Sequence, residues 1–506
     1  MTMEAMLKSN SYSCYDKVFS QVLHREESQE SIVPDRLPDI VSVISAGGPA
    51  LIRSKDVGEG KIRLEANVPV RVSYYSESGD ISCLDVNIPF YLSVENADIP
   101  QGGICVVGLT LIEISARIQN PRKLCITASI DIALDCYDKR ETVFAESPQE
   151  DPCSIHALTH TADVSYVGMV SEKTFVLTDE FLLEEESTPI EEILEQSVRL
   201  ETGEFQHVGT KLILKGTAFS RILYRSALMA IDTAEFATQF SQIFETEDGQ
   251  AASTADAVLL LSGAYFDIAP GYDGRTVQME LHAVVQTRAY ITDQVPYLAE
   301  AYSNRYALSL RRESREICCV RRAVEMRESL REQIDLAPEV TEAVLYHADV
   351  LGTEVNESAL SVRFGLKILA KREDGRCFIL SRNASVRFKG DSDSDGAALR
   401  ISSIRIEDAH MTASGNHAEV RLNVTAVAQI IEEGELTCIQ GISYDESAPL
   451  DLSNRPSLVI MKASSSDDLW SIARDNCSSV EAIEAANELD RSGAAWEKLI
   501  LIPRSI

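Results

Sequence analysis

The chain has 506 residues, of which 45% are hydrophobic, and it carries a net charge of −32 at pH 7 with a pI of about 4.7. This length predicts about three or four domains, each able to bury a core. Binding to nucleic acid or to an anionic membrane surface needs a basic face, so the charge argues against both classes of partner. It suits a protein whose partners are neutral or basic.

The first ten residues, 1–10, lack the basic and then apolar pattern of a secretion signal, and no apolar run approaches the length of a membrane span. Eleven cysteines are scattered without a regular framework, which indicates reduced thiols rather than disulfides. We therefore expect a cytoplasmic protein without membrane insertion.

The middle of the chain repeats one order of strands three times. In the first copy, apolar and polar residues alternate from Lys61 to Tyr74, a turn follows at Gly79, and the last strand is expected at Leu124–Cys136. Alternation of this kind predicts half-buried antiparallel strands. The same order returns twice, with last strands expected at Val277–Tyr290 and Glu419–Ile431.

Connections between the copies are expected at Glu141–Asp151 and Asn304–Glu332. The part from Arg311 to Glu332 is rich in paired charges and fits either a helix or an extended connector. We place the three β domains at 1–150, 151–310 and 311–450, and a last domain at 456–506.

Cys153, His156 and His160 have the spacing of metal ligands. No fourth ligand lies nearby in the sequence, and the segment is an expected linker, so we interpret it as a surface loop with incidental histidines. The sequence also lacks a phosphate-binding loop and the Gly-x-Ser-x-Gly turn of hydrolases. We therefore expect no metal, no cofactor and no enzymatic activity.

Asp391, Asp393 and Asp395 resemble the start of a calcium-binding loop. An EF-hand needs Glu at the position that Ser402 occupies, together with flanking helices, whereas strands are expected on both sides here. We favour a solvated hairpin loop and keep a weak calcium site as the alternative.

The segment from Pro456 to Ile506 predicts a strand, two helices and a second strand in turn. The apolar runs 458–461 and 499–502 are expected to be the strands. Ser465 or Ser466 can cap the first helix, and the run Ser478–Glu481 has the pattern of a capping box for the second. The order is that of a small βααβ domain.

These elements resemble a LysM domain. The residues that match its pattern are Asp467, Leu469, Trp470, Ile472, Ala473, Ile483, Asn487, Leu499, Leu501, Ile502 and Pro503. The core that we predict for this domain consists of Leu469, Trp470, Ile472, Ile483 and Leu501. Trp470 has an alternative role as a partly exposed docking anchor.

LysM domains typically bind N-acetylglucosamine polymers in a shallow groove between the loop before the first helix and the loop after the second. The residues assigned to this groove, or to a partner surface in its place, are Ser465, Ser466, Asp467, Asp468, Asn487 and Trp496. Ser466 stands where the family usually has Gly, whose missing Cβ lets the backbone approach a sugar. The adjacent carboxylates of Asp467 and Asp468 disfavour a neutral sugar through desolvation and suit a basic protein surface. We therefore expect a protein partner, with glycan binding weak or lost.

Three tandem β domains followed by a LysM domain resemble the clostridial spore-coat morphogenetic proteins of the SipL-like type, which carry SPOCS repeats. The resemblance covers most of the chain. It implies a mainly β fold with three tandem antiparallel SPOCS-like domains and a small βααβ LysM domain. It also implies that the LysM domain docks onto a coat morphogenetic protein, the ATPase-like component of the basal layer, in the mother cell at the forespore surface.

Two classes of function remain open. The first is a non-enzymatic scaffold or adaptor in spore-coat assembly, which binds a protein through its LysM domain. The second is a cell-wall protein that binds peptidoglycan or another N-acetylglucosamine polymer. A secretion signal would favour the second class, and the sequence shows none at residues 1–10.

Overall fold

The computed structural model describes residues 2–149, 154–245, 252–269, 271, 273–356, 359–389, 398–453, 455–463, 468–487 and 498–504. Within these residues the chain is mainly β, as the sequence predicts, and two helices lie near the C-terminus. Neither of them has the length and apolar character that crossing a bilayer requires.

The first unit consists of two antiparallel sheets. One has the strand order β2–β8–β7, and in the other both β3 and β4 pair with one edge of β5 while β6 pairs with its opposite edge. The strands are β2 (Leu7–Ile32), β3 (Ser42–Gly47), β4 (Leu51–Gly58), β5 (Lys61–Tyr75), β6 (Ile81–Glu95), β7 (Ile104–Asn120) and β8 (Lys123–Pro148).

The second and third units repeat this pairing. Their long strands form the sheets β9–β14–β13 and β15–β20–β19, and the others form β10–β11–β12 and β16–β17–β18. The second unit contains β9 (Ile155–Leu182), β10 (Ile190–Val208), β11 (Lys211–Ser226), β12 (Ile231–Glu245), β13 (Thr254–Ile268) and β14 (Thr276–Ser303). The third contains β15 (Tyr306–Asp335), β16 (Val340–Asn356), β17 (Ala359–Arg372), β18 (Cys377–Phe388), β19 (Ala398–Ser414) and β20 (His417–Pro449), and the short β1 (Thr2–Glu4) pairs with β20. The three last strands expected from the sequence therefore lie in equivalent strands, β8, β14 and β20.

The long first strand of each unit is missing from the sequence-based prediction. Arg311–Glu332, for which the sequence leaves a helix or a connector open, lies inside strand β15 and pairs along its length with β20. The boundary expected at 311 therefore falls within a strand, and the linker expected from Glu141 begins inside β8. Edge strands such as β2 and β15 carry many exposed charged residues, so their hydrophobic alternation is weak.

Alternate side chains of facing strands build the core of each unit. In the first unit Ile62 and Leu64 of β5 face Ile126 and Ile130 of β8, and all four are almost fully buried. Their neighbours in sequence are more exposed, which is the pattern of two packed sheets. Burying each such side chain stabilises the fold by about 1.5–3 kcal/mol.

A bulge at the same place in each unit brings the three units together. The bulges lie in β3, β10 and β16, the strands that pair with the middle strands β5, β11 and β17. Each bulge contains one extra residue, which is Ile44, Leu194 or Tyr346 in turn. These three side chains are buried and belong to one apolar cluster. The three units thus surround a shared axis, and the bulges turn one large side chain from each unit towards it.

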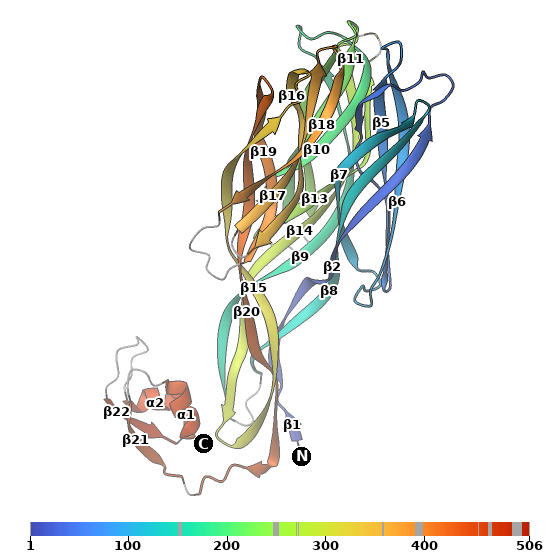
Figure 1. The fold of residues 1–506 in the computed structure, drawn as a ribbon. Helices are drawn as coiled ribbons and strands as arrows, with labels where there is room; N and C mark the ends of the chain where they lie inside the picture. The colour runs from blue at the N-terminus through green and yellow to red at the C-terminus, as the bar shows by residue number, and fades with distance from the viewer. Residues whose placement is uncertain are drawn as a thin grey trace.

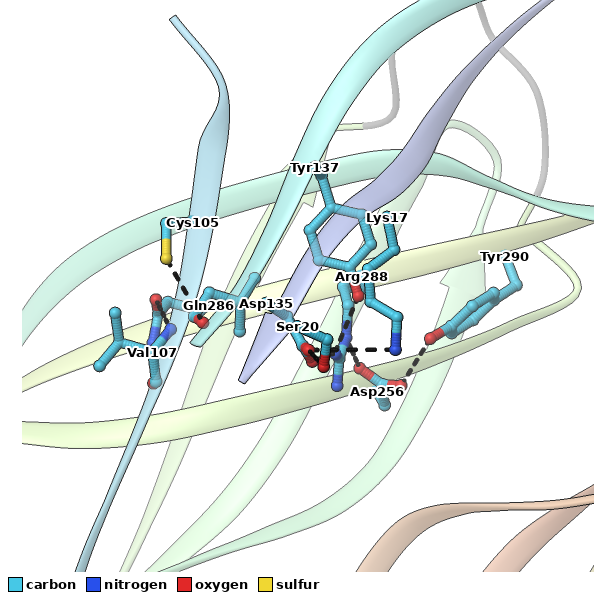
Figure 2. Close-up of polar contacts among 11 residues, drawn as sticks. Lys17, Ser20, Cys105, Val107, Asp135, Tyr137, Asp256, Gln286, Arg288 and Tyr290 are labelled. Atoms are coloured by element: carbon cyan, nitrogen blue, oxygen red, sulfur yellow. Dashed lines mark hydrogen bonds and ion pairs between the residues drawn. The ribbon is translucent and has the colours of Figure 1, made fainter. Parts of the chain in front are cut away.

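A buried polar network joins the first unit to the second (Figure 2). Arg288 of β14 donates to Asp256 of β13 at 2.6 Å, to Asp135 of β8 at 3.2 Å and to the Tyr137 hydroxyl at 3.1 Å. The Tyr290 hydroxyl donates to the second Asp256 oxygen at 2.8 Å. The Asp256 side chain is only 3% exposed, so these hydrogen bonds compensate for its burial.

The long strand pairs β2–β8, β9–β14 and β15–β20 extend beyond the body and form a stalk (Figure 1). The stalk has apolar clusters of its own, which include Phe144 of β8, Leu298 of β14 and Ile439 of β20, one from each strand pair. The N-terminal strand and the C-terminal elements lie at the far end of the stalk (Figure 1). The body and the C-terminal elements are therefore separated by the length of the stalk.

Candidate functional site: the C-terminal module on the stalk

The C-terminal module has the predicted order of elements. Strands β21 (Leu458–Ala463) and β22 (Lys498–Pro503) pair antiparallel, and helices α1 (Leu469–Asp475) and α2 (Val480–Asn487) lie between them in sequence. The sheet and helices share a small core that includes Ala463, Ile472, Ala473, Ile483 and Ile500.

Four of the five predicted core residues pack in this core. Trp470, Ile472 and Ile483 are buried, and Leu469 is half-buried against them. Leu501 is wrong as a core residue because its side chain is 37% exposed. Strand side chains alternate between two faces, so the buried positions of β22 are the neighbours of Leu501, Ile500 and Ile502.

The described residues of the predicted groove have structural roles inside the module. Asp468, rather than Ser465 or Ser466, is the N-cap of α1, and it accepts hydrogen bonds from the backbone N–H groups of Trp470 and Ser471. The side chain of Asn487 binds both backbone polar groups of Leu501, at 2.6 and 2.7 Å, and so ties α2 to β22. Ser465, Ser466, Asp467 and Trp496 lie outside the described residues.

Helix α2 is capped by a different serine from the one the pattern suggests. The Ser479 hydroxyl accepts from the Ala482 backbone N–H at 3.1 Å, whereas the Ser478 hydroxyl donates to the Pro503 carbonyl. The predicted start of the second helix is thus right to within one residue. The Ser478 hydroxyl is used instead to fix β22 against the turn between the helices.

The module is held on the stalk through Trp470, which the sequence predicts as a core residue with a docking anchor as the alternative. Its indole N–H donates to the Glu300 carboxylate of β14 at 2.7 Å, and Arg474 donates to the same oxygen at 3.2 Å. The Tyr302 ring meets the indole edge to face, with 4.8 Å between ring centroids. Trp470 therefore joins the module core to the stalk of the same chain.

The turn between the two helices makes the second contact between the module and β14, and we call the two contacts together the seat of the module. The Ser478 carbonyl accepts hydrogen bonds from the Tyr302 hydroxyl at 3.0 Å and from the Asn304 side chain at 3.1 Å. Burial, together with the nearby Glu481 carboxylate, raises the pKa of Tyr302, so this hydroxyl stays protonated as a donor at neutral pH. His156 of β9 stacks on Tyr302 and contacts Asn304.

Glu300, Tyr302 and Asn304 have no signal in the sequence that would reveal their role. They lie in the outer end of β14 and the turn after it, more than a hundred residues before the module that they bind. The sequence predicts a strand only at 277–290, whereas β14 continues to Ser303 and carries Glu300 and Tyr302 to the end of the stalk.

The outer face of the module sheet is apolar. The side chains of Leu458, Ile460, Leu499 and Leu501 are between 37% and 70% exposed, and Ile460 and Leu501 are direct cross-strand partners. Lys462 lies opposite Leu499 on the same face. An apolar surface of this kind on a small domain is typical of a contact site for another protein.

The structure describes only part of the candidate metal ligands. His156 belongs to the seat of the module, His160 packs edge to face on Tyr297, and Cys153 and Asp391 to Asp395 lie outside the described residues. In the described part of the chain, no group of three or more His, Cys, Asp or Glu side chains has the arrangement of a metal site.

A cavity of about 490 Å³ lies between the three units, and residues of all three line it. Among its charged side chains, Arg199 pairs with Glu201 at 2.9 Å within the second unit, and Lys367 of the third unit pairs with Glu195 of the second at 2.9 Å. The Lys367–Glu195 pair therefore links the second and third units beside this cavity.

Comparisons of the chain with protein-family models, with curated proteins and with solved structures give no match.

Proposed function

We propose that this chain is a non-enzymatic scaffold or adaptor in spore-coat assembly, which binds a coat morphogenetic protein through its C-terminal LysM-like module. Three β units followed by a βααβ module support this proposal, because that order is the one for which the sequence resembles SPOCS-repeat proteins with a LysM domain. The net charge of −32 suits a protein partner better than nucleic acid or an anionic membrane.

The observation that carries the proposal is the position of the module. It sits at the far end of the stalk (Figure 1), and the apolar outer face of its sheet is exposed rather than packed on the body. A scaffold needs a contact surface held away from its bulk, so that a partner reaches it without a clash. The stalk provides that separation, and the seat on Glu300 and Tyr302 gives the module a fixed orientation.

The partner proposed is the ATPase-like component of the coat basal layer, in the mother cell at the forespore surface. Asp467 and Asp468 are expected to set the association rate through the charge of the partner more than to set the final affinity. The role of Asp468 as the cap of α1 limits how it can be tested. Alanine at this position removes a cap worth about 0.5–2 kcal/mol, whereas asparagine keeps the cap and removes the charge.

The test is calorimetric titration of the full chain with the purified ATPase-like protein, and separately with N-acetylglucosamine oligomers. We expect saturable binding of the protein and little or no heat from the oligomers. The association rate, followed by stopped-flow mixing with the same protein, should be several-fold lower for the double variant Asp467→Asn and Asp468→Asn, while the control Glu481→Gln on the other helix should associate like the wild type.

The alternative is binding of peptidoglycan or another N-acetylglucosamine polymer, which the strand-helix-helix-strand order of the module favours equally. Tight binding of the oligomers with no binding of the ATPase-like protein would overturn the adaptor proposal. It would assign the chain to the cell wall.

A further inference from the structure

Two cysteines face each other across the strand pair β7–β8. Cys105 and Cys136 are direct Cα partners in an unbroken stretch of register, and both side chains are almost fully buried. Residues directly opposite in an antiparallel pair share one face of the sheet, and their Cα atoms lie about 4.5–5.5 Å apart. This separation lies within the range of about 4.4–6.8 Å that a disulfide spans.

Among the described residues, Cys105 and Cys136 are the one pair of cysteines that lie directly opposite each other in a strand pairing. In the strand pairings of the described residues, the other cysteines lie opposite residues of other types, for example Cys14 opposite Arg140 and Cys438 opposite Glu313. Cys318 and Cys319 are adjacent in β15, where successive side chains point to opposite faces. A disulfide between Cys105 and Cys136 would therefore need the least change of backbone.

We propose that Cys105 and Cys136, which are free thiols in this structure, form a reversible disulfide when the protein meets hydrogen peroxide. The Cys136 thiolate attacks one peroxide oxygen, the O–O bond breaks, and the departing hydroxide takes a proton to give water. The sulfenic acid formed on Cys136 is then attacked by the Cys105 sulfur, which loses its proton as a second water leaves. The two sulfurs give up two electrons in total, and one peroxide becomes two waters.

The surroundings of the pair assign these roles. The pKa of Cys136 is lowered, chiefly by a hydrogen bond from the Cys105 thiol and also by the Lys55 ammonium, against the opposing effects of burial and of the Asp135 carboxylate. The same thiol–thiol interaction, followed by burial, raises the pKa of Cys105. Cys136 is therefore the better nucleophile and Cys105 the resolving thiol. Because both side chains are almost fully buried, bulky disulfides such as oxidised glutathione are excluded from the pair.

The disulfide would link β7 and β8, the two strands of the first unit that contact the second unit here. Next to Cys105, both backbone polar groups of Val107 bind the Gln286 side chain, at 2.9 and 2.8 Å (Figure 2). On either side of Cys136, Asp135 and Tyr137 bind Arg288. A covalent link between β7 and β8 at this point restricts separation of strands that both contact the second unit. Oxidation is thus expected to make the junction more resistant to unfolding.

The test uses the full chain, treated with hydrogen peroxide, then denatured, alkylated and mapped by mass spectrometry of its peptides. We expect the loss of two of the eleven alkylatable thiols, one peptide pair linked through Cys105 and Cys136, and full recovery with dithiothreitol. Cys105→Ala and Cys136→Ala should each abolish the linked peptide, and Cys438→Ala should retain it as a buried control.

A second measurement guards against variants that fold poorly. Oxidised wild-type protein should unfold at a higher urea concentration than the reduced protein, and this shift should vanish after dithiothreitol. Retention of all thiols, loss spread over many cysteines, or oxidation of Cys136 to a sulfinic acid without a linked peptide would each overturn the proposal.

Discussion

Removal of the Asp256 carboxylate should destabilise the junction of the first two units more than the loss of any exposed carboxylate. Asp256 accepts from Arg288 at 2.6 Å and from Tyr290 at 2.8 Å, and its side chain is 3% exposed. Truncating one partner of a buried ion pair costs about 3–5 kcal/mol because the other charge is left without compensation. Arg288 keeps Asp135 at 3.2 Å, so we expect Asp256→Ala to fall near the lower end, at about 3 kcal/mol.

The assay is urea unfolding at pH 7, followed by circular dichroism, with the same preparation of wild type and variants. Asp131→Ala is the matched control, because its carboxylate is 26% exposed and pairs with His24 at the surface. Exposed pairs contribute about 0–1 kcal/mol, so this control should change little. The double variant Asp256→Leu and Arg288→Met should lie much closer to wild type than Asp256→Ala, since it leaves no unpaired buried charge.

A loss below about 1 kcal/mol for Asp256→Ala, in a protein with unchanged circular dichroism, would refute this reasoning. It would mean that Arg288 is satisfied by Asp135 and Tyr137 without Asp256. An equally large loss in the double variant would also refute it, because packing rather than charge would then explain the effect.

Three further outcomes are expected. Leu194→Ala, which empties part of the axial cluster, should lower stability by about 2–5 kcal/mol in urea unfolding and should affect the three units together. Burial raises the pKa of Glu201, so this carboxyl binds a proton more tightly in the folded protein than in the unfolded chain. The urea midpoint of the wild type, measured relative to Glu201→Gln, should therefore rise as pH falls from 7 towards about 4.5 and then level off. Glu300→Gln removes the charge that holds Trp470 and Arg474, and should speed amide exchange in α1 while leaving exchange in the body unchanged.

The sequence is informative where a strand has one buried and one exposed face. Residues 61–74 alternate because the inner side chains, such as Ile62 and Leu64, pack against the second sheet. It is uninformative for strand β15, whose exposed positions carry Arg and Glu and whose extended conformation depends on pairing with β20. Pairing over such a distance in the chain is a tertiary property, and local composition does not encode it.

The same limit applies to the candidate site. The core of the module follows from helical spacing, which correctly places Ile472 and Ile483 inside. The error at Leu501 arises from the two-residue period of a strand, since a shift of one position exchanges the faces. The seat on Glu300 and Tyr302 joins segments that only the complete fold brings together.

The three strand pairs of the stalk have equivalent pairing. Among the described residues, the module buries Trp470 against only one of them, β9–β14. Counted from the register shift that the strand pairs share, the residues that correspond to Glu300 are Ser147 and Gly441. Neither has a carboxylate that could accept from both an indole N–H and a guanidinium. The three strand pairs are therefore similar, and the presence of Glu300 in one of them explains why the module binds there. Through this contact, a body with threefold repetition holds a single module in one orientation.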